Sequence, residues 1–163
     1  MAVTSYAIAF GSNRRSRHGS PAATVRLAAE ALGVETLSAI RSTRAVGPAG
    51  RGFANAAAIL HSDLDPPQLL AALKALERRF GRRSGRRWGA RVLDLDIILW
   101  SGGSWADGAL TVPHPEFRRR AFVLEPLAEI AAQWKDPISG ATARQLLHRL
   151  RRPRAVDPRG SHP

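Results

Sequence analysis

The chain has no cysteine among its 163 residues, which excludes a disulfide framework and leaves the redox compartment open. Long hydrophobic runs are also missing, because none approaches the ~20 uninterrupted apolar residues that a transmembrane helix needs. Residues 1–13 contain a short apolar run with no basic residue before it, unlike a signal peptide. We therefore expect a soluble, cytoplasmic protein.

Acidic side chains are scarce: 13 Asp and Glu stand against 25 Lys and Arg, a formal net charge of +12. Such an excess indicates an anionic partner, which can be nucleic acid, an acidic membrane surface or a phosphate-rich small molecule. The hydrophobic content of 44% and the length suit one domain with its own core. We expect that domain to span residues 1–150 and a disordered basic tail to follow at residues 151–163.

Hydrophobic periodicity and turn residues predict the order of the elements. Two helices are expected from Ser20 to Gly33 and from Asp65 to Gly81, each with a proline directly after its capping residue. The predicted strands are residues 5–10, 36–43, 53–61 and 87–100, a short extended piece is expected at 110–113, and two further helices at 120–132 and 142–150. The order β-α-β-β-α-β is that of ferredoxin-like α+β folds.

Two aspartates, Asp94 and Asp96, lie inside the apolar segment 87–100. Because side chains alternate across a strand, both carboxylates share one face, with their Cα atoms roughly 7 Å apart. Like charges in a buried strand need compensation. Arginines can neutralise them as a structural pair, the strand can lie at an edge in water, or the carboxylates can bind a divalent cation such as Mg²⁺. The spacing alone leaves all three open.

The residues before this strand favour a phosphate ligand. Seven arginines and no acid or lysine lie between Arg78 and Arg91, and arginine is suited to bidentate phosphate contacts. Carboxylate-bound Mg²⁺ beside arginines is how proteins hold nucleoside triphosphates for transfer chemistry. The GxxxxGK[ST] loop and the kinase glycine-rich loop are both missing, which argues against the common nucleotide-binding folds.

The segment RWGARVLDLDII, residues 87–98, resembles the defining motif of the hydroxymethyldihydropterin pyrophosphokinase family. The resemblance runs from about Tyr6 to Leu150. Its other pieces are Gly11-Ser12-Asn13, Thr43 with Val46-Gly47-Pro48, Phe53-Ala54-Asn55-Ala56, Glu77 with Gly81-Arg82, and LTVPHPEFRRRAFVLEPL at 110–127. The resemblance implies a three-layer α-β-α sandwich with a mainly antiparallel sheet. It also implies transfer of the β,γ-diphosphate of ATP to the hydroxymethyl group of 6-hydroxymethyl-7,8-dihydropterin in folate biosynthesis, with AMP as the other product and two Mg²⁺ ions.

The resemblance also implies roles for single residues. The metal ligands would be Asp94 and Asp96, and the arginines that stabilise the transferring phosphates would be Arg82 and Arg91. ATP would contact Glu77, Arg87, Trp88, Ile97, Thr111, His114 and Arg120. The pterin would contact Thr43, Phe53, Asn55 and Phe122, because a flat heteroaromatic ring suits aromatic faces and an amide can pair with its polar edge.

The chain departs from the family pattern at Ala45, Ala90 and Pro115, and its loop 81–88 is one residue short, so either Arg83 or Arg86 can match the second loop arginine. Two alternatives stay open: a catalytically silent nucleotide-binding relative, and a basic nucleic-acid-binding ferredoxin-like domain. The second lacks the aromatic pattern of RNA-binding sheets. We expect a monomer whose partners are ATP and the pterin, with no nucleic acid and no membrane.

Overall fold

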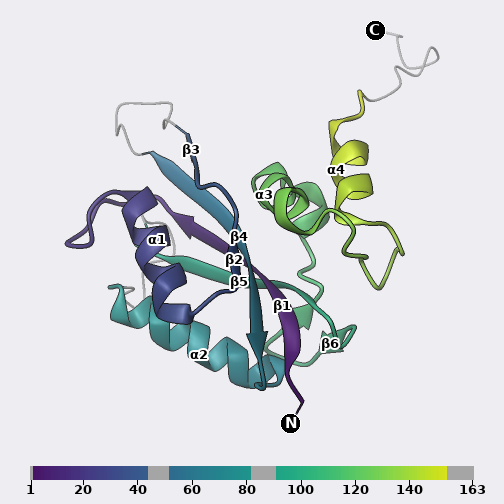
Figure 1. Cartoon of the computed structure of the whole chain (residues 1–163), viewed down its shortest axis with the longest axis horizontal. Helices are drawn as coiled ribbons and strands as arrows, with labels where there is room; N and C mark the ends of the chain where they lie inside the picture. The colour runs from purple at the N-terminus through teal and green to yellow at the C-terminus, as the bar shows by residue number, and fades with distance from the viewer. Residues whose placement is uncertain (1, 44–51, 82–90, 154–163) are drawn as a thin grey trace, which may run out of the picture.

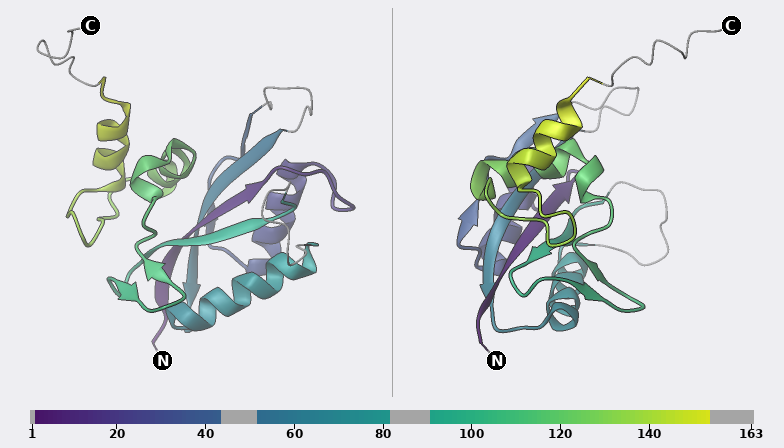
Figure 2. Two further views of the ribbon diagram at one scale, coloured as in Figure 1. Left: turned by 180° about the vertical axis from the view of Figure 1, so that it is seen from behind. Right: turned by 90° about the vertical axis from the view of Figure 1, so that its right-hand side faces the viewer.

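The computed structural model describes residues 2–43, 52–81 and 91–153. An antiparallel sheet forms the middle layer, with α1 (Pro21–Leu32) and α2 (Pro66–Arg79) on one face. The other face carries α3 (Ala121–Ala131) and α4 (Ala143–Arg151), as Figures 1 and 2 show. The predicted three-layer α-β-α sandwich is confirmed.

The central sheet has the order β2-β4-β1-β5, and β3 also pairs with β4. The strands are β1 (Thr4–Ser12), β2 (Thr36–Leu37), β3 (Arg41–Thr43), β4 (Phe53–Ser62) and β5 (Asp94–Trp100). Every pairing is antiparallel. The third long strand lies beside the first, with the second and the last outside them, which is the ferredoxin-like arrangement predicted from the element order.

Both predicted helix starts are confirmed. Ser20 caps α1 by accepting a hydrogen bond from the amide of Ala23, and the helix ends at Gly33 in the left-handed region, with φ of 73°. Asp65 and Gln68 form a capping box at the start of α2. These local signals fix the ends of the two helices and therefore where the chain re-enters the sheet.

Alternation along the strands separates two cores. On β1, Tyr6, Ile8 and Phe10 pack under α1 and α2, whereas Ala7 packs under α3 and α4. On β5 the register against β1 shifts between Ala7 and Ile8. This bulge lets Ile98 and Leu99, although consecutive, both join the core under α3 and α4.

Two predicted strands have the wrong boundaries. The strand expected at 36–43 is split into β2 and β3, because the Ser38 hydroxyl accepts from the amide of Ala57 and the amide of Ala39 turns to Glu129. β5 begins only at Asp94, because residues 91–93 are irregular; residues 87–90 lie outside the described part of the chain. The extended piece expected at 110–113 is confirmed as β7 (Thr111–Val112), which pairs with β6 (Trp105–Ala106), a strand that was not predicted.

The segment after β7 connects the two sides of the sheet. A short 3-10 helix, η1 (Phe117–Arg119), precedes α3, and its Arg118 binds the buried Asp136 through two hydrogen bonds of 2.6 and 2.8 Å. The turn that follows Asp136 is thereby fixed to η1. The predicted tail lies outside the described residues from position 154 onward. None of the helices in the described ranges is long and apolar enough to cross a membrane.

Candidate active site

The two aspartates lie at the start of β5, on the side of the sheet that faces α3. Leu95 and Ile97, which alternate with them, are buried under α1 and α2, so the predicted division of the strand's faces is confirmed. Opposite them on β1 are Gly11, paired with Asp94, and Ala9, paired with Asp96. Because glycine and alanine have such small side chains, these cross-strand neighbours leave room for a ligand beside both carboxylates on this face of the sheet.

The surroundings of Asp96 combine burial with charge of both signs. Burial raises the pKa of its carboxyl, and the negative charge of Asp94 raises it further. His114, Arg120 and Lys74 act in the opposite direction and lower the pKa, so positive charge from more than one part of the chain favours the ionised form of this carboxylate. The carboxylate is therefore costly to ionise alone, and a nearby cation would stabilise it.

The donor set can be tested for a metal. The described residues hold no cluster of three or more His, Cys, Asp or Glu side chains able to bind an ion. Asp94 and Asp96 are the two carboxylates that the strand offers on one face. Mg²⁺ keeps several waters and is usually bound through one or two carboxylates plus substrate phosphates. The residues present therefore fit Mg²⁺ that is held jointly with a phosphate ligand.

Arg91 is fixed beside Asp94 by the end of β1. Its backbone amide donates to the side-chain oxygen of Asn13, and the amide of Asn13 donates to the Arg91 carbonyl at 3.1 Å. Its guanidinium lies 3.0 Å from the Asp94 carboxylate. Val92 and Leu93, both buried, anchor the chain between them. The guanidinium is thus held at the edge of the carboxylate pair.

A pocket of about 440 Å³ opens next to Asp94 and Arg91. All four residues predicted for the pterin line it, together with the end of β1: Gly11, Ser12, Asn13, Thr43, Phe53, Asn55 and Phe122. Phe53 and Phe122 keep 45% and 50% of their surface exposed, so they are not core residues. A Cβ atom at Gly11 would lie 3.5 Å from the Asn55 amide oxygen, an ordinary van der Waals contact, so Gly11 and Asn55 are close neighbours in this wall.

The residues predicted for ATP come from several parts of the chain around β5. His114 and Arg120 act on Asp96 electrostatically, and Thr111 is exposed on β7. Ile97 and Glu77 are buried; the Glu77 carboxylate accepts from the amide of Leu95 at 3.2 Å and lies 3.2 Å from the Lys74 ammonium. The predictions for Arg82, Arg87 and Trp88 lie outside the described residues, as do Ala45, Ala90 and the choice between Arg83 and Arg86.

Sequence reasoning missed Lys74 as a member of this site. Lys74 precedes Glu77 by one helical turn, so it lies on the same face of α2 and reaches both Glu77 and the surroundings of Asp96. The sequence feature that could have revealed Lys74 is its spacing of three residues from Glu77. That spacing indicates a site residue only when α2 is known to pack against β5. Asn13 was noted within a motif but without a role; its role is to hold Arg91.

Comparison with known proteins identifies the family. Residues 7–132 match the family model described as 7,8-dihydro-6-hydroxymethylpterin-pyrophosphokinase (HPPK). The chain belongs to the HPPK family. The predicted resemblance is therefore confirmed, over more than two thirds of the chain.

Individual HPPK relatives agree with this assignment. The chain is 44% identical over 117 residues to a 2-amino-4-hydroxy-6-hydroxymethyldihydropteridine pyrophosphokinase of Synechocystis sp., which covers 72% of this chain and 60% of the relative. It is 35% identical over 144 residues to the protein of that name from Haemophilus influenzae, covering 84% of this chain and 87% of the relative. The match thus spans about three fifths of the Synechocystis protein's own length.

Solved structures support the fold. The crystal structure of Plasmodium falciparum HPPK-DHPS matches with a TM-score of 0.69 at 11% identity, covering 91% of this chain and 41% of that one. At this identity the match concerns the fold alone, and it agrees with the α+β, ferredoxin-like sandwich described above. In that protein the matched region is part of a longer chain.

Proposed function

We propose that the chain is a diphosphokinase that transfers the β,γ-diphosphate of ATP to the hydroxymethyl group of 6-hydroxymethyl-7,8-dihydropterin, giving AMP and the pterin diphosphate in folate biosynthesis. The observation that carries the proposal is the pocket in which two exposed aromatic rings and an amide lie directly beside Asp94 and Arg91. One end suits a flat polar ring and the other suits a charged phosphate chain.

The aromatic end accounts for the pterin. Phe53 at the start of β4 and Phe122 in the first turn of α3 offer ring faces from two layers of the fold. Asn55 supplies both a donor and an acceptor, and Thr43 a hydroxyl, for the polar edge of the ring. This end orients the hydroxymethyl group toward the carboxylates.

The carboxylate end accounts for the phosphates. Asp94 and Asp96 would hold two Mg²⁺ ions, which when bound would neutralise the triphosphate and activate the attacking hydroxyl. Arg91, Arg120 and His114 lie around this pair and would stabilise charge on the migrating diphosphate. Arg82, Arg87 and Trp88 stay predictions for the same ligand.

The edge of β5 that faces away from β1 suits the base of ATP. The amide of Leu95 points away from β1, toward Glu77, and backbone groups two residues apart point the same way, so Ile97 presents its amide and carbonyl at this edge. Its side chain is buried, so any contact from Ile97 would be through its backbone. Glu77 would act here by holding the backbone of β5 in place through the Leu95 amide. Thr111 on β7 would lie next to the base.

The test is a product analysis. The full chain is incubated with ATP, Mg²⁺ and the pterin, and the nucleotides are separated by chromatography. One AMP per diphosphorylated pterin is expected. ADP as the stoichiometric product would contradict the proposed reaction, and ATP binding without turnover would favour the silent relative. That the enzyme is a cytoplasmic monomer stays a prediction, tested by light scattering and cell fractionation.

A further inference from the structure

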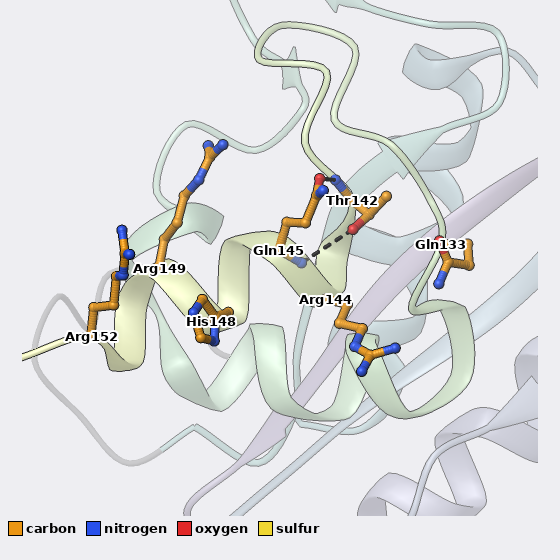
Figure 3. A pocket seen from close by; sticks show the side chains of 7 residues that line it. All are labelled: Gln133, Thr142, Arg144, Gln145, His148, Arg149 and Arg152. Carbon is orange, nitrogen blue, oxygen red and sulfur yellow. Dashed lines mark hydrogen bonds between the residues drawn. The ribbon is translucent and has the colours of Figure 1, made fainter.

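A basic surface on α4 lies apart from the proposed active site. Its lining residues surround a depression of about 590 Å³ and are shown in Figure 3: Gln133, Thr142, Arg144, Gln145, His148, Arg149 and Arg152. We call this the α4 surface. All seven residues follow position 132, the last residue that the family model matches. None of them is among the residues proposed for ATP, the pterin or Mg²⁺.

The arginines of the α4 surface are free to bind an external anion. Arg151, on the same helix, pairs with Glu125 at 3.2 Å. In contrast, Arg144, Arg149 and Arg152 form no ion pair with any residue in the described ranges, and none of the lining residues is acidic. The positive potential of this face is thus uncompensated by the described protein.

The geometry suits an extended ligand rather than a compact one. Leu146 and Leu147 bury one side of α4, and the lining residues occupy the opposite arc. At 1.5 Å per residue, Arg144 and Arg152 lie about 12 Å apart along the helix. Figure 3 shows Arg149 and Arg144 pointing in different directions, so their guanidinium groups do not converge on one point.

The lining also indicates the chemistry of the ligand, because every residue in it carries a polar or charged side chain. A protein partner would need an aromatic or aliphatic anchor, and a membrane surface would need apolar side chains to insert. A ring-containing small molecule would need apolar walls. Contacts with a phosphate backbone need only cations and hydrogen-bond donors. One strand of a duplex offers a phosphate about every 3.4 Å, or three to four over this face.

We propose that the α4 surface binds the phosphate backbone of nucleic acid without reading its sequence. Arg144, Arg149 and Arg152 each contact one phosphate, while Gln133 and Gln145 donate from their amides. This goes beyond the diphosphokinase reaction and revises the expectation that no nucleic acid is bound. Because no lining residue is aromatic, base stacking contributes nothing and affinity is independent of sequence.

The test compares two triple variants of the full chain. R144A/R149A/R152A removes the α4 arginines, and R26A/R78A/R119A removes three exposed arginines elsewhere, so both lower the net charge equally. Binding to fluorescent 30-base-pair duplexes of two unrelated sequences is followed by anisotropy from 50 to 200 mM salt. The unmodified chain should bind both sequences equally. The α4 variant should bind at least about 10-fold more weakly at 50 mM, with a salt slope flatter by about 2.7.

Three results would overturn the proposal. Equal weakening in both triple variants would assign binding to net charge alone. Competition by ATP and Mg²⁺ would place the duplex in the proposed active site. Tighter binding of polyglutamate or of phosphatidylserine vesicles through the same arginines would identify an acidic peptide or a lipid as the ligand. Circular dichroism and AMP formation, both expected to be unchanged in the α4 variant, control for folding.

Discussion

Asp136 and Asp96 are two aspartates whose surroundings shift their pKa values in opposite directions. For Asp136, burial alone would raise the pKa, but hydrogen bonds from Arg118, Ser139 and the amide of Ile138 outweigh it and lower the pKa to about 2. For Asp96, burial and the charge of Asp94 dominate and raise the pKa. One carboxylate is saturated with donors, whereas the other is surrounded by more distant cations.

This difference separates a structural from a functional use of the same residue. The four hydrogen bonds to Asp136 join η1 to the turn before α4 and leave its carboxylate no capacity for a ligand. Asp96 receives no hydrogen bond from any residue in the described ranges. A cation would stabilise its ionised form, which is what a metal and phosphate site needs.

The largest expected effect is on Asp96. D96A should lower kcat at least about 10³-fold, because about 4 kcal/mol of transition-state stabilisation is lost with the metal ligand. Stability should be unchanged or slightly increased, since the repulsion from Asp94 disappears. AMP formation and urea unfolding measure the two effects. Normal turnover in D96A would contradict the role in metal binding.

The reverse pattern is expected for Asp136. D136N should lower the free energy of unfolding by about 3 kcal/mol, because it breaks a buried bidentate pair with Arg118. The kcat of the protein that stays folded should change less than 2- to 3-fold, because the activation free energy of the reaction should change by about 0.5 kcal/mol or less. If D136N lowered kcat without lowering stability, Asp136 would have a functional role like that of Asp96, and the proposed difference between the two aspartates would be wrong.

Arg91 and Arg118 allow the same comparison between a functional and a structural residue, now for two arginines. R91A should lower kcat by at least about 10²-fold, or about 2.7 kcal/mol, with a smaller change in ATP affinity, if the guanidinium acts mainly in the transition state. R118A should instead lower stability. Steady-state kinetics with varied ATP separate kcat from KM. An R91A enzyme with raised KM and unchanged kcat would limit Arg91 to ground-state binding.

Asp136 should contribute a separate pH-dependent part of the stability, which comparison with D136N isolates. Its pKa is about 2 when folded and about 3.8 when unfolded, so its stabilisation is complete above about pH 4 and is lost as pH falls toward 2. The unfolding free energies of the unmodified chain and D136N should therefore converge by about 2 kcal/mol over that range. Urea titrations between pH 2.5 and 6 measure this. A constant difference would mean that Arg118 does not hold the carboxylate ionised.

The smallest effect is expected at the exposed ring of Phe122. F122L should raise the KM for the pterin about 5- to 10-fold, equivalent to about 1 kcal/mol of lost ring contact, with little change in stability. Phe117, five residues earlier and fully buried, is the matched control: F117L should lower stability and leave the KM unchanged. Equal stability losses would make Phe122 a packing residue.

The sequence by itself determined those features that depend on local pattern. Alternation along β5 assigned both aspartates to one face, and Ser20, Gly33 and Asp65 marked the helix ends, because these preferences act within a few residues. The element order then limited the topology to the ferredoxin-like arrangement. The motif pieces named the pocket residues, although they are distant in the chain.

Only the tertiary structure decided which groups meet. That Phe53 and Phe122 are exposed rather than buried, that Lys74 approaches Asp96 and that Asn13 holds Arg91 all depend on contacts between separate elements. The splitting of 36–43 has the same origin, since Glu129 on α3 captures the amide of Ala39. Local preferences contribute only tenths of a kcal/mol per residue, so packing and long-range hydrogen bonds override them wherever the two disagree.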